Sequence, residues 1–98
     1  MKTVRKIIGF EWDAHNRDKN LAKHRVTNEE CEEVFFDERK NILKDLLHSG
    51  TEKRYIVIGS TKESRVLFVV FTIRNTKIRV ISARDLNKKE RHLYEKEA

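Results

Sequence analysis

The stretch Arg65–Arg84 decides the fold; it reads RVLFVVFTIR, then NT, then KIRVISAR. β-Branched and aromatic residues crowd both halves, as they do in β-strands. The two residues Asn75-Thr76 between the halves have the length of a tight hairpin turn. Asn75 suits a positive φ and Thr76 does not, so the sequence leaves the turn type open. The continuous apolar run in the first half predicts a central strand that is covered on both faces.

A simple register for this hairpin pairs Thr72 with Arg79 and Leu67 with Arg84. Because side chains alternate along a strand with a period of two, Arg65 and Arg84 then share one face near one end. Arg79 lies on the opposite face near the turn. A bulge in either strand would exchange these faces.

Further strands and a first helix precede the hairpin. A short strand is expected at Ile7–Trp12, and Asp13 caps a basic helix after it. Two more strands are expected at Asn41–His48 and Arg54–Ser60.

Two capping signals predict further helices. Thr27 and Glu30 have the spacing of a capping box, in which each side chain satisfies a free backbone N–H of the first turn. Asn87 and Glu90 repeat this spacing near the C-terminus. The apolar stripe of the Thr27 helix consists of Cys31, Val34 and Phe35.

Together these elements predict an α+β fold in a single domain over residues 1–98. We expect a small antiparallel β-sheet with two N-terminal helices and a C-terminal helix, with the helices gathered on one side.

Composition limits the class of partner. The 98 residues are 38% hydrophobic and 39% charged, and the net charge is +6. Such an excess favours phosphate-rich partners or acidic proteins, although solubility alone also explains it. The single Cys31 fits a reducing compartment, and the longest apolar run, Val66–Phe71, is too short to span a bilayer. These features predict a cytoplasmic protein without a membrane partner.

The strand arginines are candidates for phosphate binding. Arginine has a planar fork of donors that grips phosphate oxygens in pairs, and it can stabilise the added charge of a phosphorus transition state. Arg65, Arg79 and Arg84 are therefore candidates for contact with a nucleic-acid backbone. Cross-strand salt bridges are the alternative; the available carboxylates are those of Glu11, Asp13 and Glu52.

Other chemistry has weaker support in the sequence. Lys23-His24 could transfer protons, or could simply be a solvated helix end that favours cations. Trp12 and Tyr94 could stack on bases or pack in the core. His15, His48 and His92 show no metal-ligand spacing between them or to Cys31, so we expect no metal or other cofactor.

Motifs along nearly the whole chain resemble those of the BrnT toxins. The chain opens with Phe10-Glu11-Trp12-Asp13 and later carries Ile81-Ser82-Ala83-Arg84. The other matching positions, in chain order, are Asn20, Lys23, His24, Val26, Val34, Phe35, Glu52, Arg54, Ile58, Gly59, Arg65, Leu67, Thr72, Arg79, Glu90, Arg91 and Tyr94. Arg25 and Ser64 depart from the pattern, because the family usually has glycine at both positions.

This resemblance implies the toxin half of a type II toxin–antitoxin pair, with a RelE-like fold. Such toxins cut RNA and arrest growth until an antitoxin neutralises them. The antitoxin would be a ribbon-helix-helix protein, and the complex, as a heterotetramer, would repress its own promoter DNA.

For the reaction, the resemblance and the chemistry above give one hypothesis of metal-independent RNA cleavage. Arg65 and Arg79 would stabilise charge, and Lys23 or His24 would transfer protons. Substrate would be held by Arg54, Thr72, Arg84 and Tyr94.

Two other functions fit the sequence. One is a non-catalytic basic module that binds nucleic acid, and the other is an interaction protein that docks an acidic partner. An adjacent gene for a small ribbon-helix-helix protein would favour the toxin.

Overall fold

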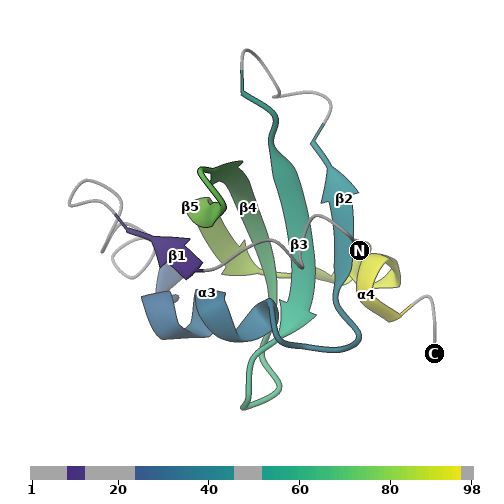
Figure 1. Cartoon of the computed structure of the whole chain (residues 1–98). Helices are drawn as coiled ribbons and strands as arrows, with labels where there is room; N and C mark the ends of the chain where they lie inside the picture. The colour runs from purple at the N-terminus through teal and green to yellow at the C-terminus, as the bar shows by residue number, and fades with distance from the viewer. Residues whose placement is uncertain (1–8, 13–23, 46–51, 96–98) are drawn as a thin grey trace.

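The computed structural model describes residues 9–12, 24–45 and 52–95, which form a five-stranded sheet with short helices (Figure 1). The strand order is β1-β5-β4-β3-β2. The strands are β1 Gly9–Glu11, β2 Asn41–Lys44, β3 Tyr55–Ser60, β4 Val66–Arg74 and β5 Lys77–Asp85. The helices are α3 Asn28–Val34, the 3-10 turn η1 Lys88–Glu90 and α4 His92–Glu95. No helix of the described residues is long and apolar enough to cross a membrane.

The β4–β5 hairpin is confirmed, and its turn is now defined. Asn75 and Thr76 both have positive φ, 49° and 67°. Positive φ at both central residues is the signature of a type I′ turn, whose twist matches that of the strands.

A β-bulge changes the predicted register partway along the hairpin. Thr72 pairs with Arg79 as expected, but the register shifts between Val70 and Phe71. Beyond the shift Phe68, not Leu67, pairs with Arg84. The bulge therefore moves Arg84 to the face that carries Thr72 and Arg79.

Helix α3 covers one face of the sheet and closes the main core. The Thr27–Glu30 capping box is present at its start. The expected stripe of Cys31, Val34 and Phe35 is buried. The helix approaches β3 so closely that a Cβ on Gly59 would lie 2.8 Å from the carbonyl oxygen of Val34.

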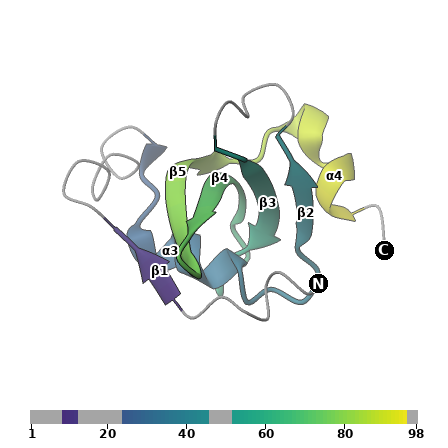
Figure 2. The ribbon, with the colours of Figure 1, turned by 45° about the horizontal axis from the view of Figure 1, so that its top comes forward.

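Helix α4 covers part of the opposite face. The Asn87–Glu90 capping box is confirmed, although it opens η1 and α4 follows it. The side-chain amide of Asn41 donates to the carbonyl of Leu93 at 2.9 Å. Asn41 pairs with Ile58, which shares its face and is fully buried. In Figure 2, α4 accordingly lies beside β2 and away from α3.

The expected RelE-like arrangement, a small antiparallel sheet with two N-terminal helices and a C-terminal helix, is wrong. The sheet is mixed, because β1 runs parallel to β5. No turn joins these two strands, so nothing local fixes their relative direction. The described residues contain two short α-helices, α3 and α4, which lie on opposite faces instead of one. The helix expected after Asp13 falls on residues 13–23, outside the described residues.

The expectation that β4 is covered on both faces holds only in part. Leu67, Val69 and Phe71 are buried beneath α3, whereas Phe68 and Val70 on the other face are half-buried. The described elements therefore cover this second face less completely than the first, and we call it the open face.

Candidate functional site

Three arginines gather around one carboxylate at the turn end of the sheet. The Nε and Nη2 atoms of Arg74 donate to the carboxylate of Glu52 at 2.5 and 3.2 Å. The pKa of Glu52 is lowered mainly by this hydrogen bond from Arg74, and also by the positive charges of Arg79 and Arg54. Arg54, Arg74 and Arg79 are named here the arginine cluster.

Thr72 supports the arginine cluster from within the sheet. Its side chain is buried, and its hydroxyl donates to the carbonyl of Lys53 at 2.8 Å. Thr72 also pairs with Arg79 across the hairpin. This hydrogen bond ties β4 to the segment that carries Glu52 and Arg54. Thr72 is thus hydrogen-bonded to the backbone segment that positions part of the arginine cluster.

The chemistry of the arginine cluster suits an anion. Arginine forks form strong charge-assisted hydrogen bonds to carboxylates and phosphates alike. In the structure the anion beside them is the Glu52 carboxylate, which is exposed enough for another anion to reach the cluster. A phosphate group could accept from the same guanidinium groups.

Arg84 shares the open face but lies at its other end. Its Nη1 and Nη2 atoms donate to the two carboxylate oxygens of Glu90, both at 2.8 Å. Its guanidinium also stacks 4.1 Å from the centre of the Phe68 ring. The hydrogen bond from Arg84 is the main cause of the lowered pKa of Glu90. Arg84 therefore holds the end of η1 against the sheet.

Arg65 lies on the α3 face, where protein groups occupy all five of its N–H donors. Nε and Nη2 donate to Asp85 at 2.6 and 3.1 Å. Nη1 donates to the Glu30 carboxylate at 3.1 Å and to the Arg25 carbonyl at 2.8 Å. Nη2 also donates to the His24 carbonyl at 3.2 Å. Arg65 thus fastens the start of α3 to the end of β5.

The structure does not bring Arg65 and Arg79 together. Arg79 pairs with Thr72, seven residues along the strand from position 65, which corresponds to about 23 Å. The two arginines also face opposite sides of the sheet, as the expected register indicated for this pair.

Of the two proton-transfer candidates, the described one, His24, is separate from the arginine cluster. Lys23 lies outside the described residues. The His24 carbonyl contacts Arg65, and the charge of His24 contributes to the lowered pKa of Asp85. His24 therefore belongs to the group around Arg65, at the far end of β4.

The two aromatic candidates form hydrogen bonds within the protein. The Tyr94 hydroxyl donates to Asp37 at 2.6 Å, which links α4 to the loop after α3. The indole N–H of Trp12 donates to Glu32 at 2.8 Å, and its ring packs against the core.

Sequence reasoning missed Arg74 as a member of the site. The only signal was its position at the end of a strand, beside the turn that also precedes Arg79. Glu52 was considered solely as a salt-bridge partner. Cys31 fits core packing, since burial raises the pKa of its thiol to about 12. The described residues contain no group of three or more His, Cys, Asp or Glu that could hold a metal ion.

One comparison with known proteins identifies a family. A family model described as the ribonuclease toxin, BrnT, of a type II toxin–antitoxin system matches residues 12–90. This range includes the whole arginine cluster, Glu52 and the β4–β5 hairpin. No curated protein matches the chain.

Proposed function

Because the chain belongs to the BrnT family of ribonuclease toxins of type II toxin–antitoxin systems, we propose that its arginine cluster binds the RNA phosphate that is cut. The observation that carries this proposal is the gathering of Arg54, Arg74 and Arg79 around the Glu52 carboxylate. The cleavage needs no metal ion in this proposal, because the guanidinium groups supply the positive charge.

The reaction proceeds through the 2′-hydroxyl of the substrate. Glu52 takes the 2′-hydroxyl proton, and the 2′ oxygen bonds to the adjacent phosphorus. The bond from phosphorus to the 5′ oxygen breaks, and that oxygen takes a proton from water. Arg79 and Arg74 stabilise the added negative charge on the phosphorus oxygens.

The arginine cluster also adjusts Glu52 for this step. Its pKa is low while Arg74 is its partner. A phosphate that enters the cluster competes for Arg74 and brings a like charge close to the carboxylate, and both effects raise the pKa. Glu52 therefore becomes a better base when the substrate is bound.

The remaining candidates take supporting roles in this proposal. Arg54 holds the substrate, and Thr72 positions the segment around Glu52. Arg65 and Arg84 are positioning residues, because both form ion pairs that fasten helices to the sheet. Tyr94 joins them in that role through its bond to Asp37. His24 is left out of the reaction, and Lys23 stays a prediction.

The class of the system implies an antitoxin protein as partner. We propose that it is a ribbon-helix-helix protein that forms a heterotetramer with the toxin. The complex then represses its own promoter DNA, and the toxin acts on RNA in the cytoplasm. Co-purification of the two chains, followed by light scattering and a promoter-binding assay, tests each part.

The decisive test incubates the purified chain with total RNA in EDTA. Arg79→Ala removes one cluster arginine, and Lys89→Ala removes an exposed charge from η1 as the matched control. We expect wild type and Lys89→Ala to degrade the RNA, and Arg79→Ala to be slower by at least about 100-fold. Intact RNA in every lane would overturn metal-independent cleavage of free RNA. Binding without product would instead favour the non-catalytic module.

A further inference from the structure

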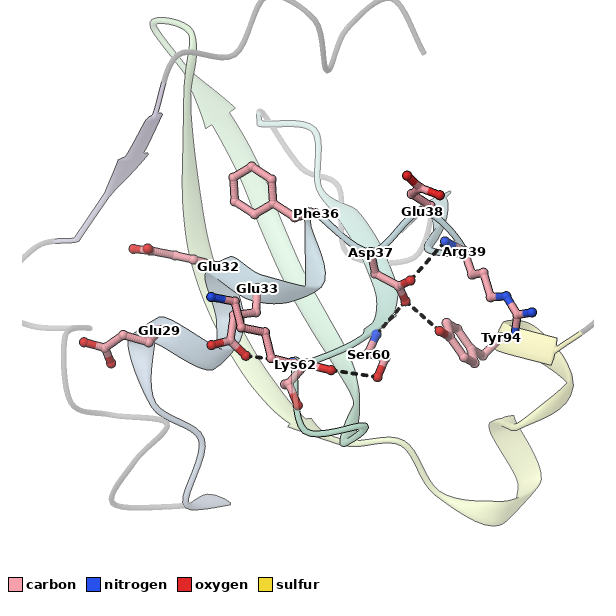
Figure 3. Close-up of a pocket in the computed structure, with 11 residues that line it drawn as sticks. Glu29, Glu32, Glu33, Phe36, Asp37, Glu38, Arg39, Ser60, Lys62 and Tyr94 are labelled. Carbon is pink, nitrogen blue, oxygen red and sulfur yellow. Dashed lines mark hydrogen bonds between the residues drawn. The ribbon is translucent and has the colours of Figure 1, made fainter.

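A negatively charged groove runs along α3, on the side of the sheet opposite the arginine cluster. It is a cavity of about 910 Å³. Figure 3 shows the carboxylates of α3 and the following loop along it, with the Phe36 ring among them. We name it the acidic groove; the members that matter here are Glu29, Glu32, Glu33, Phe36, Asp37 and Glu38.

Neutral donors hold three of these carboxylates in place. Glu33 accepts from the backbone N–H of Lys62 at 3.0 Å, and Glu32 accepts from the Trp12 indole. Asp37 accepts from the Tyr94 hydroxyl at 2.6 Å and from the Ser60 backbone N–H at 2.8 Å. These bonds orient the carboxylates without neutralising them.

The negative charge of the acidic groove is only partly compensated. Among the described residues, no lysine or arginine forms an ion pair with its five carboxylates. Arg39 and Lys62 also line the groove, so carboxylates outnumber cations there. The whole chain nevertheless carries +6. The groove therefore repels RNA and attracts a basic partner.

Phe36 adds an apolar contact beside these charges. Phe36 is 77% exposed, and among the described residues it is the only large hydrophobic one that is exposed. A guanidinium can stack on such a ring while its edge donates to a neighbouring carboxylate. An ammonium is more strongly hydrated and lacks the planar surface, so arginine fits this pair of features better than lysine.

We propose that the acidic groove binds an arginine-containing segment of the antitoxin polypeptide. The inference rests on the proposed function in one respect, that the partner is an antitoxin protein. The groove and the arginine cluster lie on opposite faces of the sheet, so this segment anchors the antitoxin without filling the RNA site. A toxin occupied only at the groove should still bind RNA.

Fluorescence anisotropy with labelled peptides tests the chemistry of the groove. The probes are two twelve-residue peptides, one alternating arginine with serine and the other alternating lysine with serine. We expect the full-length toxin to bind the arginine peptide more tightly. Phe36→Ala should weaken that binding about two- to fivefold and should narrow the difference between the peptides.

Carboxylate-to-amide variants distinguish binding in the groove from nonspecific electrostatic attraction to the toxin. Glu29→Gln combined with Glu38→Gln should weaken binding of the arginine peptide at least about threefold. Glu63→Gln removes an exposed carboxylate outside the groove and should have no effect. Equal binding by all of these variants would overturn the proposal, and so would equal affinity for the two peptides.

A second experiment uses the antitoxin itself, co-expressed with a tagged toxin. The triple variant, which combines Phe36→Ala with Glu29→Gln and Glu38→Gln, should reduce the amount of antitoxin recovered with the tagged toxin. Glu63→Gln should leave that amount unchanged. Full recovery would show that the antitoxin binds elsewhere and would overturn the assignment. Self-association of the toxin alone, lost in the groove variants, would assign the groove to a second copy and would also overturn it.

The same variants distinguish this inference from the proposed function. Groove variants should keep their RNA affinity and cleavage, and Arg79→Ala should keep its peptide affinity. If RNA cleavage fails in all proteins while the groove variants lose the antitoxin, the groove stands and the proposed reaction falls.

Discussion

At the scale of single residues, the number of protein acceptors decides what an arginine can do. Arg65 has five donors and all five are engaged by carboxylates and backbone carbonyls. Arg74 donates to the exposed carboxylate of Glu52, whose pKa is also lowered by the charges of Arg54 and Arg79. Substitutions of these arginines should therefore affect different properties, stability for Arg65 and RNA affinity for the arginine cluster.

Arg65→Lys should lower stability more than it lowers RNA affinity. A lysine keeps the charge but cannot reach Asp85, Glu30 and two carbonyls together, so the free energy of unfolding should fall by about 1–3 kcal/mol. Urea denaturation measures this change. Arg39→Lys is the comparison, because Arg39 is exposed, and should leave stability within about 0.5 kcal/mol. Equal losses in both variants would contradict the structural role of Arg65.

Two residues with strained backbones offer a second test. Arg25 and Ser64 have φ of 57° and 68°, in the left-handed region that glycine adopts without penalty. Both are positions at which the resemblance to the BrnT toxins leads us to expect glycine. Ser64→Gly should therefore raise the free energy of unfolding by about 1 kcal/mol, measured by urea denaturation. Glu63→Gly, in the same turn without a positive φ, should instead lower it.

At the scale of elements, the bulge in the β4–β5 hairpin sets the composition of the open face. One extra residue in β5 brings Arg84 to the side of Thr72 and Arg79. Without it Arg84 would point toward the core beneath α3. The bulge thus places one more guanidinium on the surface and keeps a charge out of the main core.

The contact between α3 and β3 depends on Gly59. A Cβ at this position would lie 2.8 Å from the Val34 carbonyl, and backbone atoms cannot yield as a flexible side chain can. Gly59→Ala should therefore push α3 from the sheet and lower the midpoint of thermal unfolding, with a loss of about 1–3 kcal/mol. Gly9→Ala is the control, because nothing lies within 4 Å of its Cβ. An unchanged midpoint for Gly59→Ala would contradict the close packing.

Local signals in the sequence predicted the elements better than their arrangement. Both capping boxes depend on residues three positions apart, and both are present. The register predicted from the two-residue turn correctly pairs Thr72 with Arg79. The bulge, the parallel β1 and the position of α4 depend on contacts between distant segments, which no short pattern encodes. For the same reason the arginine candidates could be predicted one by one, whereas their assembly around Glu52 could not.

At the scale of the whole molecule, charge is segregated between two faces. The arginine cluster lies on the open face, and the acidic groove follows α3 on the other. A partner that binds through electrostatic attraction can therefore distinguish the two faces. Under the two proposals above, this separation would let one small domain hold a polyanion and a basic polypeptide at different places.

Acid should destabilise the fold through its ion pairs. The pKa values of Glu52, Asp85 and Glu90 are lowered, mainly by hydrogen bonds from Arg74, Arg65 and Arg84 respectively. A carboxylate with a lowered folded-state pKa stabilises the fold above its unfolded pKa of about 4, and this contribution is lost as pH falls further. The thermal midpoint should therefore be steady near neutral pH and fall below about pH 4.

Asp85→Asn provides the control for this acid dependence. The variant should be less stable than wild type at pH 7, because Arg65 loses its carboxylate partner. Its curve should approach that of wild type at low pH, where Asp85 is protonated in both states of the wild type. Parallel curves at every pH would contradict the ion-pair explanation.

The parallel pairing of β1 with β5 also determines when the sheet can form in a newly made chain. β1 leaves the ribosome before β5, the strand that it pairs with, has been synthesised. Contacts between such distant segments form late, after the hairpins between neighbouring strands. The nascent toxin therefore cannot complete its sheet until β5 has left the ribosome, so a chain that is still shorter than this has no finished fold with which to act on RNA.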